Sequence, residues 1–315
     1  MGQKQTGNSN NRHRTRKRIR KRRRSPARSI TILLCVILGV FCAYKISPAA
    51  NQLVPGLRIN SANAALMDFE NGSILFDKNG TAKMYPASMT KIMTAVVALE
   101  HINDLNEKVV LSNALFQPIY SKNASTAGFL PGESVPAIDL LYGLLLPSGA
   151  ECAAGLAEHV SDSESAFVKL MNDKAQEIGM SGSNFTNTTG LHDKNHYSTA
   201  IDMAVLFHYA LANDTFYEII TSSKHSAPST NRHEAGITYY SSLFSKINSP
   251  EFDGGSILGG KTGYTRKAGQ CLASLAVKDD KKYILVTSGA NGNNQTQGLH
   301  IDDAFTVYTA IGLSL

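Results

Sequence analysis

The stretch PASMTKIMTAVVAL, residues 86–99, decides how the rest of the chain is organised. Ala, Met, Lys and Leu favour a helix, and a proline is tolerated in the first turn, so the stretch predicts a helix that starts close to Pro86. Positions three apart lie on one face of a helix, so the Lys91 amine would lie beside the Ser88 hydroxyl. Ser-x-x-Lys arises about once by chance in a chain of this length, so other segments must support it.

Segments on both sides of this helix predict a sheet made from the two ends of one domain. Before the helix, Asn71-Gly72 separates two apolar runs, 64–69 and 73–76, which is the pattern of a β-hairpin. After it come predicted helices at 139–146, 151–160, 163–178 and 198–211, strands at 256–258 leading into 261–263, at 270–277 and at 283–288, and a closing helix at 302–311. This order predicts an α/β (α+β) fold, in which an antiparallel sheet is flanked by helices and a cleft separates it from an all-helical subdomain.

Two further motifs add chemically useful groups. Ser148-Gly149-Ala150 offers a second hydroxyl, and Lys261-Thr262-Gly263 lies in a predicted strand. The Lys261 amine and the Thr262 hydroxyl suit a carboxylate, and a glycine at 263 lets a ligand backbone approach the strand. Lys91 can act as a base only if it is neutral near pH 7. Burial and a nearby cation such as Lys261 would both lower its pKa.

With its surroundings, the motif set resembles the serine D-alanyl-D-alanine carboxypeptidases, the low-molecular-weight penicillin-binding proteins. The matching blocks lie in the family's order at residues 85–95, 140–149, 189–191 with 196–200, and 260–265 with 268–269. The resemblance covers about residues 62–290. It implies a β-lactamase/transpeptidase-like fold and a hydrolase that trims the terminal D-alanine from peptidoglycan stem pentapeptides. It implies no metal and no cofactor, and β-lactam antibiotics would acylate the same serine.

The resemblance also implies a role for each motif. Ser88 would attack the carbonyl carbon of a terminal D-Ala-D-Ala peptide, Lys91 would act as the base, and Ser148 would relay a proton to the leaving amine. Lys261 and Thr262 would hold the terminal carboxylate. Gly263 belongs to the same substrate-binding strand, and the N–H groups of Ser88 and Tyr264 would form the oxyanion hole.

Ala150 departs from the family pattern, which has an asparagine there that contacts the substrate and helps to fix the lysine. Losing such a donor would cost about 1–3 kcal/mol. A catalytically impaired penicillin-binding or wall-binding protein is therefore an alternative. Retained release of D-alanine would exclude it.

Two other enzyme classes have weaker support. A class A β-lactamase needs a glutamate that activates the deacylating water, and residues 184–196 contain none. A metallopeptidase would use His192 and His196, which are four apart but follow Gly190 in a predicted loop rather than on a helix.

The basic charge of the chain lies in its N-terminal segment. Of 31 Lys and Arg, twelve lie in residues 1–28 without any acidic residue, which leaves 19 basic against 25 acidic residues in the remainder. Residues 29–46 are mostly apolar, so the pattern favours a membrane anchor or signal segment over nucleic-acid binding. We therefore expect a cytoplasmic tail at 1–28, the anchor or signal at 29–46, a linker at 47–61 and a penicillin-binding/peptidase domain at 62–315 outside the membrane. If the signal were cleaved, the domain would be secreted.

Four cysteines are present. Cys35 and Cys42 lie in the apolar segment. Cys152 and Cys271 are surrounded by apolar residues, which predicts two buried free thiols.

Overall fold

The computed structural model describes residues 57–312 apart from 294 and 297, together with Gly2. The basic tail, the apolar segment 29–46 and most of the linker lie outside the described residues, so these predictions stay predictions. Within the described part of the chain, no helix is both long and apolar enough to cross a bilayer.

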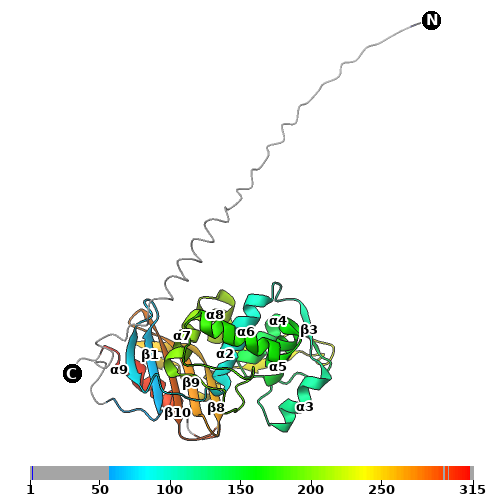
Figure 1. Cartoon of the computed structure of the whole chain (residues 1–315). Helices are drawn as coiled ribbons and strands as arrows, with labels where there is room; N and C mark the ends of the chain where they lie inside the picture. The colour runs from blue at the N-terminus through cyan, green and yellow to red at the C-terminus, as the bar shows by residue number, and fades with distance from the viewer. Residues whose placement is uncertain (1, 3–56, 294, 297, 313–315) are drawn as a thin grey trace. The chain divides into compact units, whose positions relative to one another are not determined.

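A six-stranded antiparallel sheet joins segments from both ends of the folded part (Figure 1). Its strands are β1 (Asn63–Asp68), β2 (Ile74–Lys78), β7 (Glu251–Phe252), β8 (Gly255–Thr265), β9 (Gly269–Lys278) and β10 (Lys281–Ala290). Their order in space is β2-β1-β10-β9-β8-β7, so the N-terminal hairpin lies beside the last strand. The predicted hairpin, the three long C-terminal strands and the antiparallel pairing are confirmed.

Helices cover both faces of this sheet. In β10, Ile284 belongs to the larger hydrophobic core and its neighbour Leu285 to the smaller one. Helix α7 (Ala200–Leu211) packs on the first face, and α9 (Leu299–Ala310) packs on the second. Successive strand residues point to opposite faces, and both faces are buried, so these strands are apolar throughout instead of alternating.

The helical subdomain is built around α2 (Thr90–His101), which is buried from Thr90 to Ala98. Three predicted helices pack against α2, namely α4 (Ala137–Leu145), α5 (Ala150–Ser161) and α6 (Glu164–Glu177). Helix α6 begins at its expected cap, where the Ser163 side chain accepts a hydrogen bond from the N–H of Ala166. Gly179 follows the helix with a φ of +84°, which suits a helix stop.

The sequence did not reveal several short elements. These are the 3-10 turns η1 (Ala87–Met89) and η2 (Phe244–Lys246), the helices α3 (Asn113–Ser121) and α8 (Asp214–Thr221), and the strand pairs β3 (Lys108–Val110) with β4 (Ser134–Pro136) and β5 (Lys224–Ala227) with β6 (Ile237–Tyr240). Helix α3 contains Pro118, which is normally a helix breaker. Strands of three or four residues show too little alternation to be recognised. Helix α9 starts at Leu299, three residues before the predicted start.

Asp303 ties the start of the folded part to α9. Its buried carboxylate accepts hydrogen bonds from the N–H groups of Asn60 and Ser61, both at 2.7 Å, and from the Ser61 hydroxyl at 2.6 Å. Replacing Asp303 by Ala leaves these donors unpaired, so we expect a loss of about 2–4 kcal/mol in the free energy of unfolding. Denaturant unfolding measures this loss. Thr306→Ala on the exposed side of the same helix should change it by less than about 0.5 kcal/mol, and equal losses in both variants would contradict the role of Asp303.

Candidate active site

Ser88 lies in the 3-10 turn η1, directly before α2. The Lys91 amine donates to the Ser88 Oγ at 3.3 Å and to the carbonyl oxygen of Thr189 at 2.9 Å. Ala87 has a φ of +48°, a left-handed conformation that costs a residue with a side chain about 1 kcal/mol. A strained turn thus presents the serine next to the lysine, as the spacing in the sequence predicts.

Two glycines allow neighbouring backbones to close on this turn. A Cβ on Gly190, which has a φ of +80°, would lie 1.8 Å from the Ala87 carbonyl oxygen. A Cβ on Gly263 would lie 3.1 Å from the Ser88 nitrogen. The sequence predicts that Gly263 admits a ligand backbone, and in the structure it admits the backbone of η1. A side chain at Gly190 would displace its loop from the turn that carries Ser88, and one at Gly263 would require a shift of a few tenths of an ångström.

The second motif lies between α4 and α5. Ser148 has a φ of +74°, and its buried hydroxyl has no hydrogen-bond partner among the described residues. Ala150 is fully buried as the first residue of α5, and its N–H donates to the carbonyl oxygen of Ser125 at 2.8 Å. A buried hydroxyl without a partner is costly, so the Ser148 hydroxyl is a group that a bound ligand would complete.

The third motif lies in β8, and its residues occupy two environments. Thr262 lines a cavity beside Ser88, and its hydroxyl shares a hydrogen bond of 2.6 Å with the hydroxyl of Ser242. Lys261 is fully buried, and its amine donates to the carbonyl oxygen of Thr262 at 3.0 Å. The described lining of that cavity does not include Lys261. The structure therefore places Lys261 behind the cavity wall.

Two cavities meet at Ser88. One has a volume of about 160 Å³ and extends toward Ser148 and Thr262. The other has a volume of about 330 Å³ and extends toward His192. Ser88 and Tyr264 line both cavities, so an extended molecule can pass the serine with one end on each side.

Burial sets the charge state of the two lysines. It lowers the pKa of Lys91 to about 8, although the charge of Glu151 acts in the opposite direction. Burial and the neighbouring Lys91 hold the pKa of Lys261 well below its ordinary value. The sequence predicts that burial and a nearby cation such as Lys261 lower the pKa of Lys91, and burial is the cause that the structure bears out. An amine that is easily deprotonated beside a serine hydroxyl is what a general base requires.

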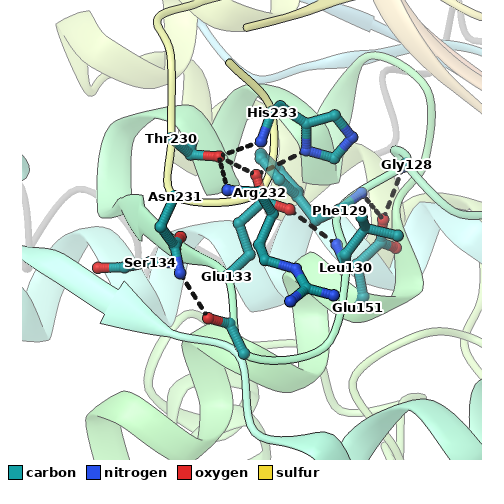
Figure 2. A network of polar contacts seen from close by, with 11 residues as sticks. Gly128, Phe129, Leu130, Glu133, Ser134, Glu151, Thr230, Asn231, Arg232 and His233 are labelled. Atoms are coloured by element: carbon teal, nitrogen blue, oxygen red, sulfur yellow. Dashed lines mark hydrogen bonds and ion pairs between the residues drawn. The ribbon is translucent and has the colours of Figure 1, made fainter.

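Two buried carboxylates hold the loop that follows Ser125 (Figure 2). Glu151, in the first turn of α5, accepts hydrogen bonds from the N–H groups of residues 127–129 at 2.6–3.3 Å. Figure 2 shows the two from Gly128 and Phe129. Glu133 accepts from the N–H of Leu130 at 2.8 Å and from the Thr230 hydroxyl at 2.6 Å, and it contacts the His233 ring nitrogen at 2.8 Å. The loop is thereby fixed to the start of α5, close to Ser148 and Ala150. The sequence did not identify either carboxylate as part of the site.

His192 and His196, the two histidines considered as metal ligands, have different environments. The Nε2 of His196 is hydrogen-bonded to the Thr90 hydroxyl at 2.7 Å, and its Nδ1 accepts from the N–H of Thr186 at 3.1 Å. Burial lowers the pKa of His196 to about 4, so the ring is neutral near pH 7. Both of its ring nitrogens already have protein partners, and His196 fastens the loop before α7 to the nucleophile helix. The ring of His192 packs edge-on against Tyr85.

Cys152 and Cys271 are buried free thiols, which confirms the prediction. Burial raises the pKa of both thiols, so neither is a reactive thiolate near neutral pH.

A serine beside a buried lysine amine, placed between two cavities, is the arrangement of an enzyme that forms an acyl-serine. Residues 48–292 match the family model described as D-alanyl-D-alanine carboxypeptidase (peptidase S11). The match spans most of the chain, so the chain belongs to this family.

Curated relatives agree with this assignment. The D-alanyl-D-alanine carboxypeptidase DacF of Bacillus subtilis is 31% identical over 281 residues, which cover 88% of this chain and 70% of DacF. The D-alanyl-D-alanine carboxypeptidase DacC of Escherichia coli is 30% identical over 256 residues, which cover 77% of this chain and 60% of DacC. The chain thus spans between three fifths and seven tenths of the length of these two relatives.

Solved structures share the fold. The DD-transpeptidase of Streptomyces K15 superposes with a TM-score of 0.72 at 26% identity, over 80% of this chain and 97% of that one. The D-alanyl-D-alanine carboxypeptidase of Mycobacterium tuberculosis gives a TM-score of 0.69 at 27% identity, over 81% of this chain and 93% of that one. The β-lactamase/transpeptidase-like architecture expected from the sequence is confirmed.

The unpaired Ser148 hydroxyl leads to a prediction about stability. Ser148→Ala removes a buried polar group that has no partner, so we expect the free energy of unfolding to rise by about 1 kcal/mol while acylation slows. Thermal or denaturant unfolding measures the first effect. Ser242→Ala is the matched control, because its hydroxyl is paired with Thr262, and we expect it to lower stability. A destabilised Ser148→Ala variant would mean that the hydroxyl has a partner in the folded protein.

Proposed function

We propose that this chain is a serine D-alanyl-D-alanine carboxypeptidase in which Ser88 is the nucleophile and Lys91 the general base. Its substrates are peptidoglycan stem peptides that end in D-Ala-D-Ala, so its role lies in the bacterial cell wall. The observation that carries the proposal is the 3.3 Å contact between the Ser88 Oγ and a buried lysine amine, at the point where two cavities meet.

Acylation begins when the neutral Lys91 amine takes the proton of the Ser88 hydroxyl. The Ser88 oxygen then bonds to the carbonyl carbon between the two D-alanines, and the N–H groups of Ser88 and Tyr264 stabilise the oxyanion. Such preorganised donors commonly make the greatest single contribution to acyl-transfer catalysis. The bond to the leaving nitrogen breaks as that nitrogen receives a proton through Ser148. Free D-alanine leaves, and the remaining peptide is an ester of Ser88.

In deacylation, water is the nucleophile and Ser88 is the leaving group. Lys91 accepts a proton from the water, the water oxygen attacks the ester carbonyl, and Ser88 leaves with a proton. A β-lactam would open its ring on the same serine. Because its leaving nitrogen stays tethered to the acyl group, we expect that acyl-enzyme to hydrolyse slowly.

Each cavity suits one part of the substrate. The leaving D-alanine is small and ends in a carboxylate, which fits the 160 Å³ cavity with its hydroxyl groups from Ser148 and Thr262. The longer stem peptide then occupies the 330 Å³ cavity on the side of His192. Gly263 and Tyr264 form the strand along which the substrate backbone lies.

The environment of Lys91 supports an active enzyme despite Ala150. In the family the asparagine at this position helps to fix the lysine. Here the carbonyl oxygen of Thr189 accepts a hydrogen bond from the Lys91 amine at 2.9 Å. The base is therefore held without the asparagine, which favours the carboxypeptidase over an impaired wall-binding protein.

The proposed location outside the cytoplasm follows from the substrate and from the sequence pattern. Residues 62–315 form the penicillin-binding/peptidase domain, residues 29–46 the anchor or signal, and residues 1–28 a cytoplasmic tail. Support for the anchor comes from the basic-then-apolar order alone.

The pKa of Lys91 predicts how activity depends on pH. The base must be neutral, and burial lowers the Lys91 pKa to about 8, so the neutral fraction grows as the pH rises through 8. We expect kcat/KM for a D-Ala-D-Ala peptide to increase about tenfold from pH 6 to pH 7 and to level off above the Lys91 pKa. A profile that falls over this range would exclude Lys91 as the base.

A substitution at Glu151 should shift the pH profile of kcat/KM. Its charge raises the pKa of Lys91, so Glu151→Gln should move the rise in kcat/KM to lower pH. Glu158→Gln, later in the same helix and half-buried, is the matched control and should leave the midpoint in place. If Glu151→Gln loses activity without any change in midpoint, Glu151 acts only by holding the loop at 127–129.

The decisive experiment measures D-alanine release from a pentapeptide that ends in D-Ala-D-Ala. We expect release by the parent protein and none above background by Ser88→Ala, with both variants folded by circular dichroism. Binding of penicillin by a folded parent that releases no D-alanine would instead favour the impaired penicillin-binding protein.

A further inference from the structure

Ser125, which belongs to none of the three motifs, lines both of the cavities that meet at Ser88. Among the described residues, three line both cavities, and the other two are Ser88 and Tyr264. Ser125 is exposed, so its side chain is accessible to a bound molecule. An extended substrate that occupies both cavities must therefore pass Ser125 as well as the nucleophile.

The backbone around Ser125 is fixed on both sides. The carbonyl oxygen of Ser125 accepts a hydrogen bond from the N–H of Ala150 at 2.8 Å. Before it, the N–H of Ala124 donates to a carbonyl oxygen of α3 at 3.2 Å. After it, the N–H of Ala127 donates to the buried carboxylate of Glu151 at 2.6 Å. Among the residues that the structure describes, the Ser125 hydroxyl has no hydrogen-bond partner. A hydroxyl on a fixed backbone is preorganised to bind a ligand.

The start of α5 supplies no polar side chain at Ala150. Ala150 is fully buried, and it belongs to the described lining of neither cavity. Its methyl group cannot form a hydrogen bond in any case. The backbone of Ser125 lies directly against this residue, and Ser125 does line both cavities. A polar contact that residue 150 does not make can therefore come from Ser125.

The proposed function leaves one polar group of the substrate for Ser125 to bind. The N–H groups of Ser88 and Tyr264 bind the reacting carbonyl, and the hydroxyls of Ser148 and Thr262 face the leaving D-alanine. The next peptide group lies on the stem side of the reacting D-alanine. Its N–H can donate to the strand along which the substrate lies, as in β-strand addition. Its carbonyl oxygen then still needs a donor, since a peptide group taken out of water is costly without one.

We propose that Ser125 is a substrate-binding residue whose hydroxyl donates a hydrogen bond to the carbonyl oxygen of the peptide group that precedes the reacting D-alanine. The inference rests on the proposed function, because that function places the stem peptide in the larger cavity. The group that Ser125 recognises is an acylamino group on the reacting residue. Ser125 therefore makes the enzyme prefer acyl donors that carry such a group.

Two other roles for Ser125 lead to different results. If its hydroxyl acted on the leaving group, its removal would slow acyl donors with and without an acylamino group equally. If Ser125 only held its loop, its removal would disturb Glu151, whose charge raises the pKa of Lys91, and the pH profile of kcat/KM would shift. The test must therefore vary the acylamino group of the substrate as well as the serine.

The experiment uses two thioesters of thioglycolate, which share one leaving group. The acyl group of the first is N-acetyl-D-alanyl, and that of the second is propanoyl, which lacks the acetamido group. We expect Ser125→Ala to lower kcat/KM for the first thioester about 3- to 10-fold and to leave the second unchanged, since one neutral hydrogen bond is lost. The midpoint of the pH profile should stay in place. Ser125→Thr keeps a hydroxyl and should keep most of the preference.

The controls separate this proposal from the proposed function. D-Alanine release by the parent tests the function, whatever Ser125 does. Thr126→Ala removes a hydroxyl from the next residue of the same loop, which is exposed and lines neither cavity, and it should keep the parent's preference. Equal losses on both thioesters, no loss on either, or a shifted pH midpoint in Ser125→Ala would overturn the proposal.

Discussion

The exclusion of water from the Lys91 amine is the constraint on which the rest of the site depends. A lysine in water holds its proton far above neutral pH and cannot serve as a base. Here α2 is buried from Thr90 to Ala98 and packs against α4, α5, α6 and α7, and burial lowers the pKa of Lys91 to about 8. The sheet contributes at the neighbouring turn, because β8 packs against η1, which holds Ser88 beside that lysine.

Backbone strain and an unpaired buried hydroxyl also occur close to Ser88 and Lys91. Ala87 and Ser148 both have positive φ angles, and the buried Ser148 hydroxyl has no partner among the described residues. Such costs persist only where the surroundings impose them. The surroundings do so here through close backbone contacts at Gly190 and Gly263, and through the carboxylate of Glu151, which holds the loop at 127–129. The strain thus lies on Ala87, next to Ser88, and the strain and the missing partner coincide at Ser148.

The sequence could predict those parts of the structure that depend on local pattern. The spacing of Ser88 and Lys91 on a helix, the hairpin at Asn71-Gly72 and the cap at Ser163 all follow from short-range rules, and the structure confirms them. Long apolar strands such as β9 were equally evident, because burial on both faces makes them continuous. These features were enough to predict the order of the elements and so the fold.

What the sequence could not predict depends on contacts between distant segments. Nothing in the residues near Thr189 indicates that its carbonyl oxygen would hold Lys91, since the two are 98 positions apart. A backbone acceptor carries no side-chain signature at all. The buried carboxylates of Glu133 and Glu151 likewise resemble ordinary surface acids in a helical or polar stretch. Only the packing shows that each accepts several hydrogen bonds, those of Glu151 all through Oε1.

The two lysines of the first and third motifs illustrate how position gives the same side chain separate roles. Lys91 is buried beside the serine, where losing a proton is easy and a base is needed. Lys261 is buried behind Thr262, where it can support the strand but does not reach the cavity lining. Both amines are buried, so the difference between them lies in what they contact: the Lys91 amine faces the Ser88 hydroxyl, and the Lys261 amine faces a backbone carbonyl oxygen. Only the first arrangement places an amine where it can take the proton of a nucleophile.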